Sequence, residues 1–400
     1  MDLRSGQAFW PIQNGLLRVY PPLARDERCE VAVIGGGITG ALVAYHLVQA
    51  GLETVVLDRR DVGMGSTAAS TAVLQYEIDT HLTDLVGLVG EEHAVRAYRL
   101  CLEAVDKLAA LVGTLDDPCS LQRRPSLYLA SSPRHVAALR EEAEARRRIG
   151  IAVGFLGRGE LAERYGIRAP GALRSQTAAE ADAYRLTHRL LEAAQGRGLR
   201  VYDRTEVTGW SYPGSGVRLA TDRGYGVSAR AMVFASGYET QAYLRQRLAV
   251  LRNTYAFVSE PLEPGALWPE RCLVWETARP YLYVRTTPDH RVIVGGADDP
   301  YRTLPLRERR IPRKERRLLR RFGELFPGVA LEPAFAWAGT FGETKDGLAY
   351  IGESPEIPRA YFALGYGGNG ITYSLVAAEI LRDLLLGHDN PDRHVFRFDR

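Results

Sequence analysis

The chain has 400 residues, 46% of them hydrophobic, which is enough apolar material for sizeable cores and indicates a globular protein. The formal net charge of +3 is too balanced to indicate a nucleic-acid partner. The four scattered cysteines make neither a disulfide framework nor a zinc site, and no run approaches the roughly 18 apolar residues of a membrane span, so we expect a cytoplasmic protein without a metal.

A motif near the N-terminus is typical of a dinucleotide-binding unit. Residues 31–34 are apolar, as in a strand buried on both faces, and they run directly into glycines spaced G-x-G-x-x-G. Gly35 permits the sharp turn, Gly37 lets the backbone approach a pyrophosphate, and Gly40 lets the helix predicted at 41–50 pack close to the strand. The helix directs its N-terminal amides and positive dipole end at the phosphates.

A second buried strand is predicted at 54–57, and it ends in Asp58. An acid at this point accepts hydrogen bonds from ribose hydroxyls, which favours an adenosine dinucleotide without a 2′-phosphate. Because strand, glycines, helix, second strand and acid all occur at the required spacing, the motif predicts dinucleotide binding rather than a chance glycine-rich turn.

The loop that follows Asp58 consists of small residues at 63–72. The backbone of such a loop can run along a ligand, and its hydroxyls can reach phosphate or ring oxygens. The alternative is an ordinary flexible connection. Residues 1–28, before the motif, are expected to be an extended arm that lies over the fold.

The pattern of apolar residues in the middle of the chain predicts a mixture of helices and strands. Helices are expected at 91–112, 133–149 and 186–195, and strands at 126–130, 199–202, 206–210 and 231–236. Successive strands at 254–259, 272–276, 281–285 and 292–294 indicate an antiparallel sheet. We interpret the arginine-rich residues 307–321 as an amphipathic surface helix, with a nucleic-acid or lipid patch as the alternative.

A second glycine cluster, G-Y-G-G-N-G-I-T, begins at Gly365 and leads into a helix predicted at 373–386. Glycines before a helix N-terminus present backbone amides to something negative. Since the first motif already accounts for a pyrophosphate, this cluster is expected to face the other end of the cofactor.

Five motifs occur in an order that resembles the D-amino-acid oxidase (DAO) family of FAD-dependent oxidoreductases, which includes glycine, sarcosine and γ-glutamylputrescine oxidases. They are V-A-V-I-G-G-G-I-T-G, G-S-T-A-A-S-T-A, M-V-F-A-S-G-Y, D-G-L-A-Y-I-G and G-Y-G-G-N-G-I-T. The resemblance implies a mixed α/β fold, in which a Rossmann-like FAD-binding domain carries an inserted, mainly antiparallel β substrate domain. The FAD-binding domain is expected at 1–95, 178–245 and 330–400, and the substrate domain at 96–177 and 246–329.

The resemblance also implies how FAD is bound. Residues 235–237 are expected by the pyrophosphate, Val207 is expected to offer its backbone to the adenine, and 367–372 are expected at the pyrimidine edge of the isoalloxazine. Helix amides at that edge stabilise the negative charge that reduction leaves there. The implied cofactor-binding residues are Gly35, Gly37, Ile38, Thr39, Gly40, Asp58, Arg59, Gly65, Ser66, Thr67, Ser70, Thr71, Val207, Ala235, Ser236, Gly237, Gly367, Gly368, Asn369, Gly370, Ile371 and Thr372.

The reaction that the resemblance implies is oxidation of the C–N bond of an amine or amino acid. A hydride passes from the substrate to flavin N5, the resulting imine is hydrolysed, and oxygen or another acceptor reoxidises the flavin. Two alternatives stay open. One is a dehydrogenase of the same fold that passes electrons to a carrier or quinone, and the other is a non-catalytic flavoprotein subunit.

Several positions depart from the family's pattern. The segment before Asp346 contains no cysteine, so FAD is expected to be noncovalent. Gln75 and Thr372 occupy the positions that align with the substrate-carboxylate clamp of sarcosine oxidases, and no arginine occurs between Pro333 and Asp346, where the D-amino-acid oxidase branch has its clamp. These departures favour an amine without an α-carboxylate, or a different clamp.

The remaining candidates concern the substrate. Tyr281, Tyr283 and Arg285 point to one face of a predicted strand and can line one wall of the site, the alternative being that Arg285 is an exposed sheet residue. Tyr255 is a candidate from a neighbouring strand, with core packing as the alternative. Lys345, in the flavin-side motif, is a candidate for binding substrate or assisting oxygen, or else it is a surface lysine. The strand at 292–294 lacks the oxygen-activating lysine of sarcosine oxidases, which leaves the electron acceptor open.

Overall fold

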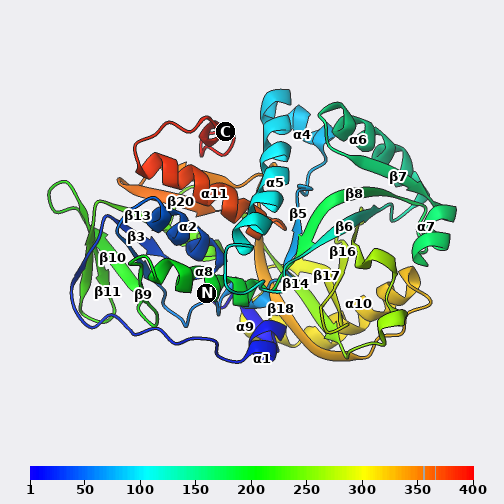
Figure 1. Ribbon diagram of the computed structural model, residues 1–400, viewed down its shortest axis with the longest axis horizontal. Helices are drawn as coiled ribbons and strands as arrows, with labels where there is room; N and C mark the ends of the chain where they lie inside the picture. Colours follow the sequence, from blue (N-terminus) through cyan, green and yellow to red (C-terminus); the bar gives the residue numbers. More distant parts are fainter. Residues whose placement is uncertain (355, 365) are drawn as a thin grey trace.

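The computed structural model describes residues 1–354, 356–364 and 366–400, so the expectation for Gly365 lies outside the described residues. Figure 1 shows two lobes side by side. In one lobe helices cover a mainly parallel sheet, and the other is built around a large, mainly antiparallel sheet. The mixed α/β architecture expected from the sequence is confirmed.

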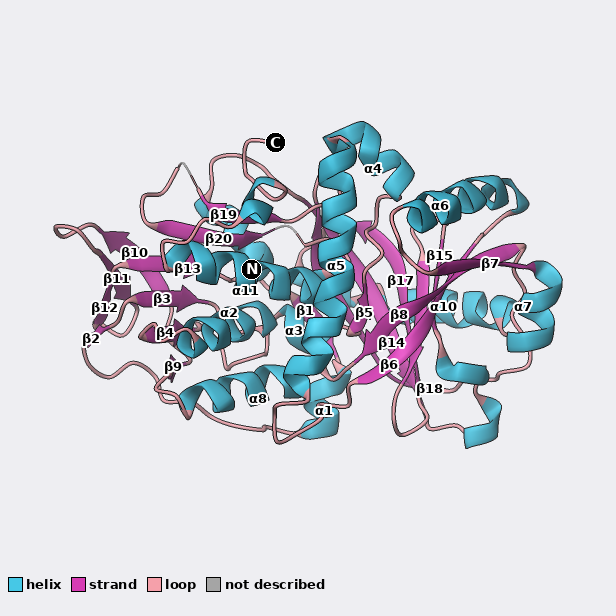
Figure 2. Ribbon diagram, turned by 45° about the horizontal axis from the view of Figure 1, so that its top comes forward, coloured by secondary structure: helices cyan, strands magenta, loops and turns pink. Residues whose placement is uncertain are grey.

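The mainly parallel sheet carries the dinucleotide-binding motif. Its described strands run in the order β19 (Tyr350–Glu353), β20 (Ala360–Leu364), β13 (Ala231–Phe234), β3 (Val31–Ile34), β4 (Thr54–Leu57) and β9 (Arg200–Tyr202). Neighbours pair in parallel, apart from the antiparallel β19 and β20. Helices α11 (Gly370–Leu385), α2 (Ile38–Gln49) and α8 (Ala183–Gln195) pack next to one another in this lobe (Figure 2).

Alternate residues of β3 and β4 are buried in two different layers. Val31, Val33 and Val56 join the core that contains the helices. Ile34 and Leu57 join a core with a small sheet. That sheet has the order β10 (Val207–Ser211), β11 (Val217–Thr221), β12 (Gly226–Ala229) and β2 (Glu27–Arg28) in the described part of the chain. Because both faces are covered, β3 and β4 are continuous apolar runs, as the sequence predicted.

The large sheet crosses most of the other lobe. Its described strands run in the order β1 (Arg4–Gly6), β18 (Pro333–Glu343), β14 (Val250–Ser259), β17 (Val292–Pro300), β16 (Leu282–Thr286), β15 (Leu273–Glu276), β6 (Gln122–Leu129), β8 (Gly171–Glu180) and β5 (Val73–Gln75), with β7 (Val153–Gly157) beside β8. The pair β15 and β6 is parallel, and the other pairs are antiparallel.

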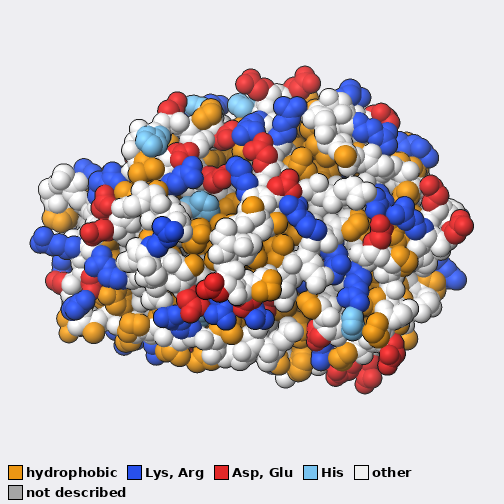
Figure 3. Space-filling view, viewed as in Figure 1, with side chains coloured by type: hydrophobic (Ala, Val, Ile, Leu, Met, Phe, Trp, Pro, Cys, Tyr) orange, Lys and Arg blue, Asp and Glu red, His pale blue; other side chains and the backbone are white. Residues whose placement is uncertain are grey.

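One face of the large sheet packs on α10 (Ile311–Leu325) through Leu318 and Phe322. The arginine-rich segment therefore forms an amphipathic surface helix as expected, although it begins later than predicted and follows the separate short helix α9 (Leu304–Glu308). Basic and acidic side chains are interspersed over the face shown in Figure 3. No helix in the described ranges is long and apolar enough to cross a membrane.

The other helices lie around these sheets. They are α1 (Phe9–Asn14), α3 (Ser66–Ala69), α4 (Leu82–Val89), α5 (Glu91–Val112), α6 (Val136–Arg148) and α7 (Arg158–Tyr165), with short 3₁₀ turns at η1 (Pro133–His135), η2 (Gly237–Tyr243), η3 (Pro264–Ala266), η4 (Pro269–Arg271) and η5 (Pro391–His394).

One expectation about chain organisation needs correction. The N-terminal segment is not simply an extended arm, because β1 pairs with β18 and α1 buries Trp10. Strand β18 pairs along its length with β14 in the large sheet, and β5 pairs with the end of β8 in the same sheet. The expected domain boundaries stay a prediction.

Candidate active site

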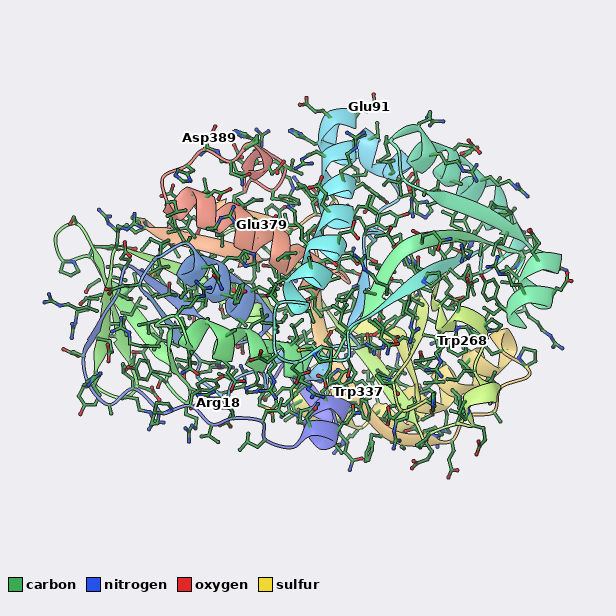
Figure 4. All side chains as sticks on the ribbon, viewed as in Figure 1. Arg18, Glu91, Trp268, Trp337, Glu379 and Asp389 are labelled. Carbon is green, nitrogen blue, oxygen red and sulfur yellow. The ribbon has the colours of Figure 1, made fainter. Side chains whose placement is uncertain are left out.

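A cavity of ≈ 480 Å³ lies where the carboxyl ends of β3 and β4 meet the large sheet. Ligands of α/β proteins bind outside the carboxyl ends of parallel strands. Figure 4 labels Trp337 between the two lobes. Its indole N–H donates to the carbonyl of Ala69 at 2.8 Å, which holds the small-residue loop and α3 against β18 beside the cavity.

The glycine turn between β3 and α2 forms one wall. Gly35 has a φ of +114°, and a Cβ there would lie 2.5 Å from the carbonyl oxygen of Ala235. A Cβ at Gly40 would lie 1.8 Å from the carbonyl oxygen of Gly35, so both positions require glycine. The hydroxyl of Thr67 accepts a hydrogen bond from the Ile38 amide at 3.0 Å, which fixes the loop to the start of α2.

Asp58 lies at the end of β4, where the sequence predicted an acid for the ribose. Its Oδ2 accepts from the Gly36 amide at 2.6 Å and its Oδ1 accepts from the Arg60 amide at 2.8 Å. Burial raises the pKa of Asp58 to about 6. Val207, expected beside the adenine, lines the same end of the cavity.

A group of charges surrounds this nucleotide end. Arg59 and Arg60 both form ion pairs with Glu239, at 2.9 Å for Arg60. The carbonyl of Met1 accepts a hydrogen bond from Arg60 at 2.6 Å, so the N-terminal segment closes over this end. Arg59 was among the expected residues, whereas Glu239 carried no motif that pointed to it.

The second glycine cluster forms the opposite end, which we call the ring end. The Gly368 amide donates to Oδ2 of Asp79 at 3.0 Å, and the Asn369 side chain donates to the carbonyl of Glu77 at 2.6 Å. Tyr238 donates to the carbonyl of Gly367 at 3.2 Å. These contacts hold the start of α11 at the cavity wall, so its free amides are available to a negative group.

Aromatic side chains of the large sheet line the ring end. They are Trp275 on β15, Tyr283 on β16 and Tyr281 next to it. The ring centroids of Trp275 and Tyr281 are 6.3 Å apart, and those of Tyr281 and Tyr283 are 5.8 Å apart. Tyr128 stacks behind Trp275 with a centroid distance of 3.7 Å. The tyrosines therefore lie where a substrate wall was predicted, and their role in binding stays a prediction.

Arg285 is not at the cavity, which corrects its expected role as a clamp. It shares a face with Tyr283, but it is 0% exposed, and its Nη1 donates to the carbonyls of Thr71, Ala72 and Ala181 at 2.7–3.0 Å. The alternative of an exposed sheet residue is wrong as well. The loop at 71–72 and the chain at 181 cover this end of the strand, so Arg285 supports the loop rather than facing a ligand.

Tyr255 and Lys345 also lie away from the cavity. Tyr255 packs in the core on the far face of the large sheet, because strand alternation turns Thr254 rather than Tyr255 toward the cavity. Lys345 is exposed, and its ammonium donates to the carbonyl of Arg400 at 2.5 Å. It is directed outward by a turn in which Asp346 pairs with Arg400 at 2.7 Å.

Most of the expected cofactor residues do lie together. Those lining the cavity are Gly35, Gly37, Ile38, Thr39, Asp58, Arg59, Gly65, Ser66, Thr67, Ser70, Thr71, Val207, Ala235, Ser236, Gly237, Gly367, Gly368, Asn369, Gly370 and Ile371, together with Gln75 from the substrate candidates. Gly40 acts through close packing. Thr372 is buried behind the wall, where its hydroxyl donates to the carbonyl of Gln75 at 3.1 Å.

Sequence reasoning missed four further residues at the ring end, which are Asp79, Tyr238, Thr254 and Asp298. It also missed Trp275, although the strand that carries it was predicted at 272–276. A tryptophan in the middle of a strand of the expected substrate sheet is a signal that could have found it.

The residues fit an elongated dinucleotide with an aromatic ring. Two helix N-termini and the carboxylate of Asp58 share one cavity. Within the described residues, Oγ of Ser66 and Nε1 of Trp275 line this cavity, are buried and have no hydrogen-bond partner. Buried polar groups are normally paired, so these two indicate a polar ligand.

Comparison with known proteins agrees with this geometry. Residues 30–384 match the family described as DAO, FAD dependent oxidoreductase. The chain is 27% identical over 369 residues to a glycine oxidase of Geobacillus kaustophilus (90% of this chain, 93% of the relative). It is 25% identical over 390 residues to a γ-glutamylputrescine oxidoreductase of Escherichia coli (92% and 86%). The crystal structure of glycine oxidase from Geobacillus kaustophilus superimposes with a TM-score of 0.77 at 23% identity, covering 91% of this chain and 96% of that one.

Proposed function

Because this chain belongs to the DAO family of FAD-dependent oxidoreductases, we propose that it oxidises a C–N bond of an amine or amino acid. The substrate loses a hydride from carbon and a proton from nitrogen, and the imine that forms is hydrolysed to a carbonyl compound. FAD, when bound, supplies the hydride acceptor. The observation that carries the proposal is that the β3–α2 turn, Asp58 and the start of α11 open onto one cavity with an aromatic wall.

The chain's own residues have three tasks in this reaction. Amides at the start of α2 hold the diphosphate, and the carboxylate of Asp58 accepts from the ribose. Amides at 367–371 stabilise negative charge at the ring end. The aromatic wall orients the substrate and excludes water from it.

The tyrosines of the wall remain neutral hydrogen-bond donors. Burial raises the pKa of Tyr283 to about 12 and raises that of Tyr281 as well, so both hydroxyls keep their protons at neutral pH. A neutral phenol donates to a substrate oxygen or accepts from an amine. The names of the two relatives support an amine, since glycine and γ-glutamylputrescine both carry one.

The electron acceptor is a separate question, and one observation favours a carrier over oxygen. Reduction of oxygen develops negative charge that a nearby cation stabilises. Of the described residues that line the cavity, the basic side chains are Arg59 and Arg60, and both lie at the nucleotide end. With Lys345 directed outward, the ring end has no lysine or arginine in its described wall.

An anaerobic reduction screen tests the proposal. Purified holoprotein is mixed with primary amines, secondary amines and amino acids, and the flavin absorbance is followed. We expect bleaching by at least one amine, followed by faster reoxidation with a dye or quinone than with oxygen. A flavin that no amine bleaches would indicate a non-catalytic subunit, and rapid peroxide formation would indicate an oxidase.

A further inference from the structure

The ring end of the cavity is acidic. Its described wall contains Asp79 and Asp298, while the basic residues Arg59 and Arg60 lie at the other end. Both carboxylates are among the charged neighbours of the Tyr281 hydroxyl, so they flank the same aromatic ring. A substrate α-carboxylate at this position would meet two like charges, and the nearby cation, Arg279, is not part of the described cavity wall.

A β-bulge turns Asp298 into the cavity. Tyr255 pairs with Gly296 and Asn253 pairs with Asp299, so two residues of β17 oppose Thr254 alone. Gly296 and Ala297 at this point have φ values of +127° and +55°. The bulge shifts the alternation by one residue, so Asp298 faces the cavity while Asp299 pairs with Lys314 at 2.8 Å on the other face.

Within the described residues Asp298 forms no ion pair, and its side-chain hydrogen-bond partner is Thr254. Its Oδ1 is buried and has no hydrogen-bond partner within the described residues. Its pKa is raised to about 6, mainly by burial and also by the charges of Glu343 and Asp79, while the hydrogen bond with Thr254 and the charge of Lys314 oppose the rise. At neutral pH it is still mostly ionised, so a partly buried anion faces the ring end, whose described wall contains no lysine or arginine. Nε1 of Trp275, a residue that is 97% buried in the wall of the same cavity, also has no hydrogen-bond partner in the described part of the chain.

We propose that this site takes an amine that carries a second positive charge, and that Asp298 and Asp79 bind that charge between the rings of Trp275, Tyr281 and Tyr283. The inference rests on the proposed amine oxidation and names its substrate class. The reacting nitrogen is neutral, and the second ammonium stays protonated. Carboxylates neutralise this ammonium, and the faces of the rings attract it.

In a competing arrangement, Arg279 would bind a negatively charged group of the substrate. It is exposed, its Nη2 donates to the carbonyl of Asp79 at 2.9 Å, and its guanidinium lies 4.8 Å from the ring centroid of Tyr281. If the substrate carried a carboxylate instead, Arg279 would be the nearest cation to bind it. The two arrangements therefore predict opposite preferences for charged substrates.

The two arrangements can be distinguished with three amines of equal chain length: butanediamine, butylamine and γ-aminobutyrate. Their binding to the anaerobic holoprotein is measured from the shift in flavin absorbance, and reduction is followed in the same cuvette. We expect butanediamine to bind roughly tenfold or more tightly than the other two. Asp298→Asn and Asp79→Asn should each lower the affinity for butanediamine by about tenfold more than the affinity for butylamine. Asp389→Asn, whose side chain is 76% exposed, is the matched control.

Equal affinity for butanediamine and butylamine, or a preference for γ-aminobutyrate that Arg279→Ala removes, would overturn the inference. If Asp298→Asn does not retain FAD, the inference is tested with Asp79→Asn alone, by comparing its affinities for butanediamine and butylamine. Failure of the proposed function is seen separately, because no amine then bleaches the flavin while butanediamine still shifts its absorbance. If amino acids bleach the flavin and butanediamine is not preferred, the proposed amine oxidation is supported and the inference of a second positive charge on the substrate is wrong.

Discussion

Gly295 on β17 lies directly beneath the ring of Tyr283 on β16, and a Cβ at position 295 would lie 2.3 Å from that ring. The two strands pair at these residues, so the tyrosine can lie flat over the sheet only because its partner has no side chain. Glycine at this position therefore sets the orientation of one wall of the cavity.

Gly295→Ala is expected to displace Tyr283, since an overpacked site relaxes by moving the more mobile side chain. We expect KM for the amine substrate to rise about tenfold, which corresponds to the ~1–3 kcal/mol typical of overpacking, with FAD content unchanged. Steady-state kinetics and the flavin absorbance measure the two effects. Gly154→Ala on β7 is the control, because a Cβ there meets nothing within 4 Å. In the Tyr283→Ala background, Gly295→Ala should raise KM no further. If the two changes raise KM additively, the interpretation is contradicted.

The titration of Asp58 predicts how the apoprotein and FAD binding depend on pH. Its pKa is raised from 3.8 to about 6, so the folded apoprotein holds a proton that the unfolded chain releases between these values. The stability contributed by this proton is present below pH 3.8 and is lost as the pH rises through about 6. Asp58→Asn apoprotein should therefore lose less stability than the wild type between pH 4 and pH 7, measured by thermal unfolding.

FAD binding should show the opposite trend, because the ionised carboxylate accepts from the ribose more strongly than the neutral acid. We expect Kd for FAD to rise as the pH falls below about 6, and Asp58→Asn to raise it roughly 30-fold at neutral pH, the equivalent of about 2 kcal/mol for a hydrogen bond to a charged group. Fluorescence titration of apoprotein with FAD measures both. An affinity for FAD that is the same at pH 5 and pH 8 would contradict the assignment of Asp58 to the ribose.

Noncovalent attachment of FAD is a third prediction. Of the described residues that line the cavity, none is a cysteine or histidine, and Cys272 is buried in the core on the far face of the large sheet. Denaturation in guanidinium followed by ultrafiltration should pass all of the flavin into the filtrate. Flavin fluorescence that stays with the chain on a denaturing gel would show a covalent bond.

The parts of the site that sequence reasoning found are those whose signals are local. The turn at 35–40 and Asp58 are specified by short-range spacing, and Tyr281 and Tyr283 follow from strand alternation. Asp298 could not be found in this way, because a bulge with two positive φ values shifts the alternation, and nothing in the sequence marks Ala297 for such a conformation.

Arg285 and Tyr255 show two other limits of the sequence. Alternation placed Arg285 on the same face as Tyr283, but the segments that cover it lie more than a hundred residues away in the chain. For Tyr255, the sequence left a role in the site and packing in the core as alternatives, and the structure has Tyr255 in the core and Thr254 at the cavity. A one-residue shift moves every side chain of a strand to the other face.

The last prediction tests whether Arg285 supports the loop or recognises the substrate. Its guanidinium donates to four carbonyls, three through Nη1 and that of Thr286 through Nε, and its Nε lies 3.5 Å from the fully buried carboxylate of Glu180. Arg285→Met leaves these groups without that cation, so we expect a loss of about 3 kcal/mol in the free energy of unfolding and a Tm lower by several degrees. Arg285→Lys should recover only part of the loss, because an ammonium does not reproduce the planar fork.

Arg313→Met, at an exposed position of α10, should change stability by less than about 0.5 kcal/mol. In holoprotein that remains folded, KM should change equally for acidic and neutral amines, and a rise confined to acidic substrates would restore Arg285 as a clamp.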